Sequence, residues 1–114
     1  MTVRERKVGD VVIVDVSGKM VATDNAGRLK DKISSLLFQG EKQIVINLAE
    51  VGYVDSSGLG EMVACYGSAT REGAKLKLAN AGNKITDLLI MTRLVTIFDA
   101  YDTEDGAIKS FAAS

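Results

Sequence analysis

The sequence predicts an α/β domain with a mixed β-sheet and crossover helices. Short runs rich in Val and Ile alternate with longer segments in which apolar residues recur every three or four positions, as expected for strands that alternate with helices. The chain contains no proline, so no proline interrupts a long helix. Its 114 residues suffice for one hydrophobic core, and we expect a single domain over residues 1–114.

Three strands and one helix are expected in the first half of the chain. The β-branched run at residues 11–16 is ended by Ser17-Gly18, and a shorter strand precedes it at about residues 3–7. Apolar residues at steps of three and four predict an amphipathic helix over residues 22–38. The nearly continuous apolar run at residues 43–48 is typical of a strand that is covered on both faces.

The second half continues the alternation of helices and strands. A helix with one apolar face is expected over residues 59–70, with Gly73 at its end. Three short elements follow: a strand at residues 75–78, a helix at 85–91 and a strand at 95–98. A last helix at residues 107–111 is expected to be capped near Asp102 or Thr103. Right-handed crossovers would gather the strand ends and the following helix starts at one edge of the sheet.

The composition excludes several classes of function. A net charge of −1 offers no attraction for nucleic acid or for an anionic membrane surface, and no apolar stretch approaches the ~18 residues that span a bilayer. The single cysteine rules out an internal disulfide, and no apolar run follows the charged start, so we expect a cytoplasmic protein without a signal peptide. The absence of histidine removes Ser-His-Asp catalysis and the commonest zinc ligand, so neither a metal nor a cofactor is expected.

The stretch at residues 53–60, YVDSSGLG, is the strongest candidate site, because α/β domains usually keep their sites where strands lead into helices. A serine nucleophile is one interpretation, but the spacing differs from G-x-S-x-G and no histidine is present as a base. A helix cap is a second interpretation. Asp55, Ser56 and Ser57 all suit that role, although one cap needs only one of them.

Two glycines in the first helical turn favour a third interpretation. Gly58 and Gly60 each cost up to about 1 kcal/mol relative to alanine, so their presence suggests that something approaches this backbone closely. A helix start offers unpaired N–H groups, and a serine there can carry a phosphate without unfolding its own helix. This interpretation makes the stretch a docking site that phosphorylation switches.

The run INLAEVGYVDSSGLGEM, with the later GAKLKL strand and the tail IMTRLVTIFDAYDTEDGAIKSF, resembles the STAS domain of bacterial anti-sigma factor antagonists. The resemblance covers the whole chain and implies a small sheet with helices mostly on one face. It makes Ser56 the phosphoacceptor. The residues around it that would bind a partner are Asp55, Ser57, Gly58, Leu59, Gly60 and Met62, where Leu59 and Met62 contribute only if their side chains reach the surface.

The resemblance also implies a binding module rather than an enzyme. In such a system, an anti-sigma factor that is also a serine kinase phosphorylates the serine, and a metal-dependent serine phosphatase resets it. The unphosphorylated antagonist binds the anti-sigma factor and thereby frees the sigma factor.

One part of the chain departs from the family pattern. Members often have G-E-L-D between the second strand and the first helix, with the aspartate near the phosphoacceptor, whereas this chain has Gly18-Lys19-Met20-Val21. Asp24 follows three residues later and suits a cap of the first helix. Lys19 is a candidate partner for a phosphate, and a solvated surface lysine is the simpler interpretation.

Two other classes of protein are alternatives. A receiver domain is phosphorylated on an aspartate at a strand end, which Asp55 could supply, but it needs an acidic pair for magnesium where this chain has Asp15 alone. The second is a STAS domain that binds a nucleotide or serves as a scaffold without serine phosphorylation, although no G-x-x-x-x-G-K-[ST] loop is present. We expect Asp15 at an exposed strand position rather than on a metal, and Cys65 buried and unreactive.

Overall fold

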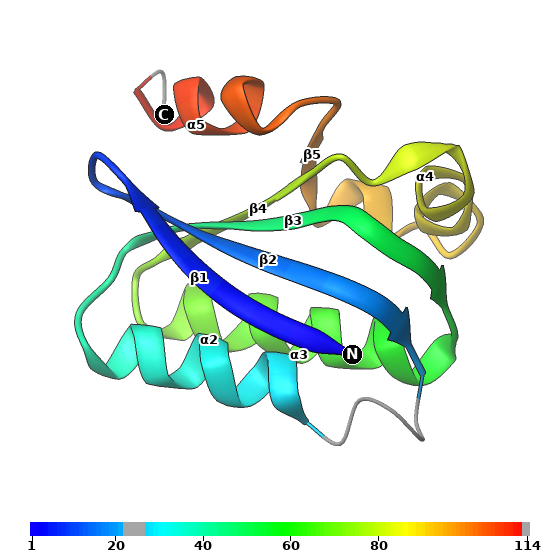
Figure 1. The fold of residues 1–114 in the computed structure, drawn as a ribbon, viewed down its shortest axis with the longest axis horizontal. Helices are drawn as coiled ribbons and strands as arrows, with labels where there is room; N and C mark the ends of the chain where they lie inside the picture. Colours follow the sequence, from blue (N-terminus) through cyan, green and yellow to red (C-terminus); the bar gives the residue numbers. More distant parts are fainter. Residues whose placement is uncertain (22–26, 113–114) are drawn as a thin grey trace.

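The computed structural model describes residues 1–21 and 27–112, which form a sheet with helices packed against it (Figure 1). In chain order, the elements are β1 (Thr2–Val8), β2 (Val11–Met20), α2 (Arg28–Phe38), β3 (Gln43–Val54), α3 (Ser56–Arg71), β4 (Lys75–Ala79), α4 (Gly82–Met91), the 3₁₀ helix η1 (Leu94–Thr96), β5 (Asp99–Tyr101) and α5 (Glu104–Ala112). The expected α/β class is therefore confirmed.

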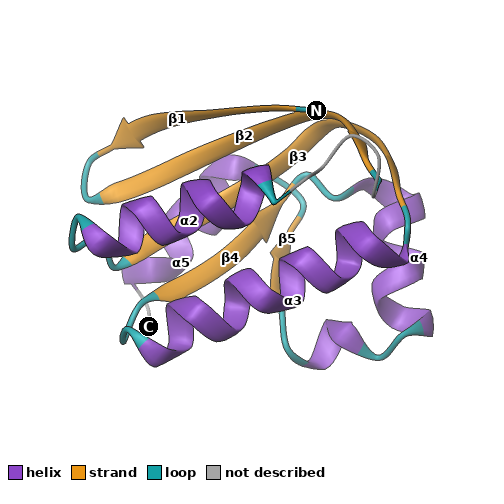
Figure 2. Cartoon of the chain, turned by 90° about the horizontal axis from the view of Figure 1, so that it is seen from below, coloured by secondary structure: helices purple, strands orange, loops and turns teal. Residues whose placement is uncertain are grey.

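The sheet is mixed, as predicted. Its strands lie in the order β1-β2-β3-β4-β5, with β1 antiparallel to β2 and all other neighbours parallel. Helices α2 and α3 lie side by side across one face, which Figure 2 presents, while α5 lies on the opposite face. Helix α4 lies beside the end of β3, near the start of α3.

Both faces of the central strands are buried, which explains their nearly continuous apolar runs. On β2, Val12 and Val14 belong to the larger core under α2 and α3, whereas Val11 and Ile13 belong to a smaller core under α5. The larger core also receives side chains from α4, so three of the four described α-helices share one core. Of these four helices, α2 and α3 cover one face of the sheet, α5 covers the opposite face and α4 lies beside the end of β3.

The two central strands run further than the sequence predicts. β2 continues through Ser17-Gly18 to Met20, and β3 continues to Val54, because the two strands stay paired as far as Met20 opposite Val54. The extension is irregular, with register shifts on both sides of Ser17-Gly18, and Gly18 takes a φ of 95° there. As a result, β3 leads directly into the candidate site.

The prediction of a strand at residues 95–98 is wrong. Arg93 takes a left-handed conformation with φ 64°, and a 3₁₀ turn follows it. Phe98 is buried, and its ring makes an edge-to-face contact with the Tyr66 ring, with 5.5 Å between the ring centroids. The strand is instead Asp99–Tyr101, which pairs with β4, so hydrogen bonding to a neighbouring strand decides its place rather than β-branched content.

The expected helix ends are confirmed where the structure describes them. Thr103 caps α5 through its Oγ1 atom, which accepts the N–H of Gly106 at 2.9 Å. The first helix is described from Arg28 onward. Its expected start at residue 22 and the expected cap Asp24 lie outside the described residues.

A buried lysine lies in the smaller core, where the sequence suggested only strand alternation. Lys77 is 4% exposed, and its Nζ donates to the Oγ of Ser110 on α5 at 2.8 Å. The same ammonium lies 4.5 Å from the centroid of the Phe111 ring. A cation over an aromatic face is stabilised when both are shielded from water, so Lys77 helps to hold α5 on the sheet.

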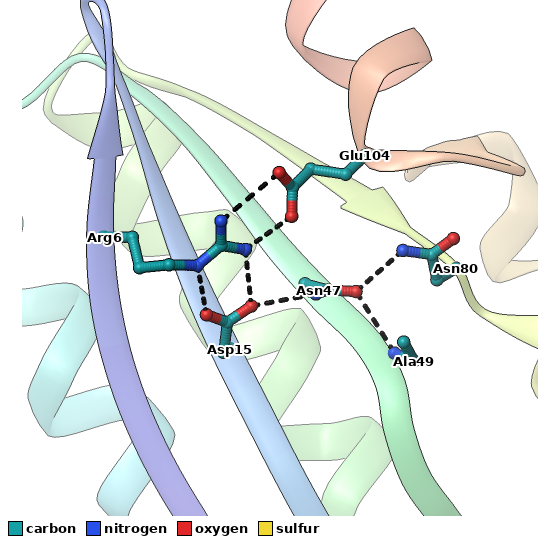
Figure 3. Close-up of polar contacts among 6 residues, drawn as sticks. All are labelled: Arg6, Asp15, Asn47, Ala49, Asn80 and Glu104. Atoms are coloured by element: carbon teal, nitrogen blue, oxygen red, sulfur yellow. Dashed lines mark hydrogen bonds and ion pairs between the residues drawn. The ribbon is translucent and has the colours of Figure 1, made fainter.

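A polar network joins four strands or their ends to α5 on this same face (Figure 3). Arg6 contacts Asp15 through two nitrogens and also pairs with Glu104 at the start of α5. Asn47 donates to Asp15 at 2.8 Å and accepts from Asn80 at 2.9 Å. Asp15 is thus an ion-pair partner at a half-buried strand position, and Arg6 holds the pKa of its carboxyl below the ordinary value.

We predict that Asp15→Asn lowers the free energy of unfolding by about 0.5–1 kcal/mol at pH 7, a range that allows for solvent screening of a partly exposed pair. Since the folded-state pKa of Asp15 is lowered, its contribution is complete above the unfolded value of about 4 and is lost as the pH falls through the folded value. Urea unfolding at pH 7 and at acidic pH should show the difference from the unmodified protein shrinking on acidification.

Asp105→Asn is the matched control, because it removes an ion pair with Lys109 whose side chains are 74% and 77% exposed. We expect no resolvable change from it at either pH. An equal effect of the two substitutions would show that the Arg6 network adds nothing specific.

Candidate functional site

The stretch singled out in the sequence lies at the junction of β3 and α3, where the parallel strands end (Figure 1). Asp55 has an extended backbone and is the one residue between the strand and the helix. Ser56 is the first residue of α3. The predicted position at a strand-to-helix edge of the sheet is confirmed.

Asp55 is the residue that caps α3. Its Oδ1 atom accepts the N–H of Gly58 at 2.9 Å, which satisfies a backbone group that would otherwise lack an intrahelical partner. Ser56 and Ser57 are both exposed. Of the three candidate caps, Asp55 therefore stabilises the helix, and Ser56 and Ser57 are exposed residues that the cap does not need.

Gly58 is buried against the end of β2, and this changes how its lack of a side chain is explained. A Cβ atom there would overlap the Met20 carbonyl oxygen, and it would lie 2.9 Å from Met20 Cβ and 3.0 Å from Val54 Cγ1. The Met20 carbonyl also accepts the N–H of Asp55 at 3.1 Å. What approaches the Gly58 backbone is therefore the chain's own second strand, so Gly58 is not a free surface for a partner.

Gly60 differs from Gly58 in its exposure and in the space around its Cα atom. It is exposed, and a Cβ atom there would meet nothing within 4 Å. No internal packing explains a glycine at this helical position, where it costs up to about 1 kcal/mol relative to alanine. Of the two glycines, only Gly60 therefore still fits the prediction of an approaching partner, which stays a prediction.

Leu59 and Met62 do not reach the surface. Leu59 is 7% exposed and Met62 is fully buried, and both belong to the larger core under α2 and α3. The expectation that these two side chains contact a partner is corrected on this ground, because the apolar face of α3 is already covered by the sheet. The exposed part of the stretch consists of Ser56, Ser57 and Gly60, together with the side chain of Tyr53, which is 56% exposed.

Glu61 has a structural role that the sequence did not reveal. Its Oε1 atom accepts the N–H of Lys30 at 3.1 Å, in the first turn of α2, where the N-cap residue Gly27 has no side chain to offer. The Glu61 carboxylate therefore faces α2. No short-range pattern could have predicted it, since 31 positions separate the two partners. Lys19 is exposed on β2 opposite Tyr53, as the simpler interpretation expects of a surface lysine.

Cys65 is a residue of α3 that is buried in the larger core, as expected. Burial raises the pKa of its thiol to about 12, and the nearby Glu61 carboxylate adds to that rise. A thiol with that pKa carries almost no thiolate at neutral pH, so it is inert. Across residues 1–21 and 27–112, no group of acidic and cysteine side chains is placed to hold a metal ion, and no helix is long and apolar enough to cross a membrane.

Three comparisons place this chain among known proteins. The family model described as the STAS domain matches residues 2–107. The anti-sigma-B factor antagonist of Bacillus subtilis is 30% identical over 96 residues, which are 84% of this chain and 86% of that protein. The crystal structure of an anti-sigma factor antagonist from Mycobacterium paratuberculosis superposes with a TM-score of 0.83 at 25% identity, covering 96% of this chain and 92% of that one.

Two further solved structures share the fold at lower identity. The unphosphorylated form of the anti-sigma factor antagonist SpoIIAA superposes with a TM-score of 0.76 at 20% identity, over 99% of this chain and all of that one. Its phosphorylated form, from Bacillus, gives a TM-score of 0.73 at 20% identity, over 96% and 99%. Both forms share the fold of this chain over nearly all of its length.

We predict opposite effects of alanine at the two glycines. Gly58→Ala should lower the free energy of unfolding by about 1–3 kcal/mol, because its methyl group must displace the Met20 backbone. Gly60→Ala should raise it by up to about 1 kcal/mol, because the site is open and alanine favours the helix. Urea unfolding of both variants measures this, and equal changes would contradict the assignment of Gly58 to internal packing.

Proposed function

This chain belongs to the STAS domain family, and on that premise we propose that it is an anti-sigma factor antagonist controlled by phosphorylation of Ser56. The unphosphorylated form binds an anti-sigma factor and so releases the sigma factor held by it. An anti-sigma factor acts on the transcription machinery, so this role belongs to the cytoplasm.

One observation carries the assignment of Ser56. Ser56 is exposed at the first residue of a helix whose cap is supplied by the neighbouring Asp55. The phosphate would therefore be added without removing the bond that starts the helix. The buried Met62 and the packing of Gly58 on Met20 support the same point, since they anchor α3 independently of either serine.

The phosphate acts on docking by its charge. It adds about −1.5 to −2 units to a surface that a partner must desolvate, and an unpaired buried charge costs on the order of several kcal/mol. The Asp55 carboxylate next to it adds repulsion. The dipole of α3 offsets only about 0.3–1 kcal/mol at an exposed terminus, so repulsion and desolvation win and the partner is released.

Two enzymes complete the switch that we propose. The anti-sigma factor itself acts as the serine kinase, which brings the phosphoryl donor to Ser56 within the docked complex. A metal-dependent serine phosphatase removes the phosphate and restores binding. The chain contributes the surface and the hydroxyl to this cycle, and no residue that acts as a catalyst.

The phosphorylated residue can be mapped directly in protein from the native host. We expect the phosphate on Ser56, with Ser57 unmodified, by peptide fragmentation after intact-mass analysis. The phosphate should survive hydroxylamine, which removes an aspartyl phosphate. A phosphate on Ser57 alone would reassign the site, and one on Asp55 would favour a receiver-like mechanism.

Substitutions at Ser56 test the direction of the switch. Against each purified anti-sigma factor of the host in turn, the unmodified chain and Ser56→Ala should bind one of them, and Ser56→Asp should bind it at least about tenfold more weakly by calorimetry. Ser34→Asp, which adds the same charge at an exposed position on α2, should bind like the unmodified chain.

Two results would contradict this function. Equal affinity of Ser56→Asp and the unmodified chain would show that charge at this position does not control docking. Binding only by the phosphorylated form would mean that a cation recognises the phosphate, and it would favour a STAS scaffold or nucleotide-binding domain without this switch.

A further inference from the structure

A largely apolar groove lies between the end of β3 and the first turns of α4. Its volume is about 450 Å³. The floor and walls are formed by apolar residues of both elements: Val51, Val54, Ala81, Ile85 and Leu88. Tyr53 and Lys84 stand at its rim, and both are exposed. We call this feature the β3–α4 groove.

The groove and the Ser56 site are neighbours along the chain, because both begin at the end of β3. Val54 lines the groove, Asp55 follows it as the cap of α3, and Ser56 comes next. Helix α4 and the start of α3 lie on the same side of the molecule in both ribbon views (Figures 1 and 2). A partner that covers Ser56 therefore needs only a short extension to reach the groove.

Exposed apolar surface extends the groove along α4. Lys84 and Leu88 line the groove, and Met91, at i+7 from Lys84, follows them on the same side of α4. Met91 is 80% exposed, and Tyr53 across the groove is 56% exposed. Large apolar side chains left in water beside an apolar groove are typical of a protein interaction site.

The described lining of the groove carries a single positive charge. Among the described residues that line it, Lys84 alone is charged. An apolar groove with one cation at its rim is complementary to an apolar side chain that has a carboxylate next to it.

We propose that the β3–α4 groove receives an apolar side chain of the anti-sigma factor, and that Lys84 pairs with an acidic residue beside it on the same partner segment. This inference rests on the proposed function, because the partner that reaches the groove is the one that docks over Ser56. The groove adds affinity that does not depend on the phosphate, and Lys84 fixes the direction in which the partner segment lies.

Two substitutions test the groove without disturbing the core. Gly52 lines the groove, its backbone is outside the left-handed region, and a Cβ there meets nothing within 4 Å, so Gly52→Phe fills the groove at little cost to folding. It should weaken binding to the anti-sigma factor at least about tenfold. Lys84→Glu should weaken it about three- to tenfold, and the loss should shrink at high salt.

Matched controls separate these effects from added bulk and added charge. Thr70→Phe places an aromatic ring at an exposed position on α3 outside the groove, and Lys75→Glu reverses an exposed charge at the start of β4. Both controls should bind like the unmodified chain. Thermal melting of all four variants confirms that each remains folded.

The outcomes distinguish this inference from the function on which it rests. Normal binding by Gly52→Phe and Lys84→Glu, with binding lost in Ser56→Asp, overturns the groove and leaves the proposed function intact. If no anti-sigma factor of the host binds the unmodified chain, the proposed function fails, and the inference fails with it.

A cross-linking experiment tests the chemistry of the occupant. Cys65 is buried, so a cysteine introduced at the exposed groove residue Asn83 is the reactive thiol for a maleimide photo-cross-linker. The partner peptide captured from the purified complex should contain an apolar residue beside Asp or Glu. A captured peptide without an acidic residue would overturn the role of Lys84.

Discussion

The close approach of Gly58 to the Met20 carbonyl fixes the end of β2 against the start of α3, and the geometry of the site depends on it. That carbonyl accepts the N–H of Asp55, and the Asp55 carboxylate in turn accepts the N–H of Gly58. Met20, Asp55 and Gly58 are therefore joined to one another by two hydrogen bonds and one close packing contact. A side chain at position 58 would force β2 and α3 apart. Ser56 lies between Asp55 and Gly58 in the chain, so its position depends on these contacts.

The spacing of apolar residues predicted the strands and helices correctly wherever burial of those residues determines the local structure. Val12 and Ile13 face opposite cores, as a strand covered on both sides requires, and the helical stripes were equally readable. Prediction failed where a distant partner decides. Residues 95–98 have strand-forming side chains, but they pair with no described strand. Asp99–Tyr101 forms the strand instead, because its backbone pairs with β4. The extension of β3 to Val54 likewise depends on pairing with Met20.

The candidate site was located from sequence, but the causes of its features were only partly assigned. A glycine in a first helical turn indicates a close neighbour, and sequence does not reveal whether that neighbour is a partner or the chain itself. For Gly58 it is the chain itself. Leu59 and Met62 show the same ambiguity, because a helix that carries a docking surface and a helix that covers a sheet have the same apolar spacing. Glu61 could not be predicted, since its partner lies on another helix.

The division between buried and exposed residues limits how a phosphate can act. Because Met62 and Gly58 anchor α3 from within, a phosphate on Ser56 changes the charge of the surface and leaves the helix in place. The change must therefore be read by the partner. In the arrangement that we propose, the β3–α4 groove contributes the same apolar contact to both forms, so phosphorylation removes only part of the binding free energy. Each 1.4 kcal/mol of that part corresponds to about tenfold in affinity, and the remainder allows the phosphorylated chain still to meet its partner weakly.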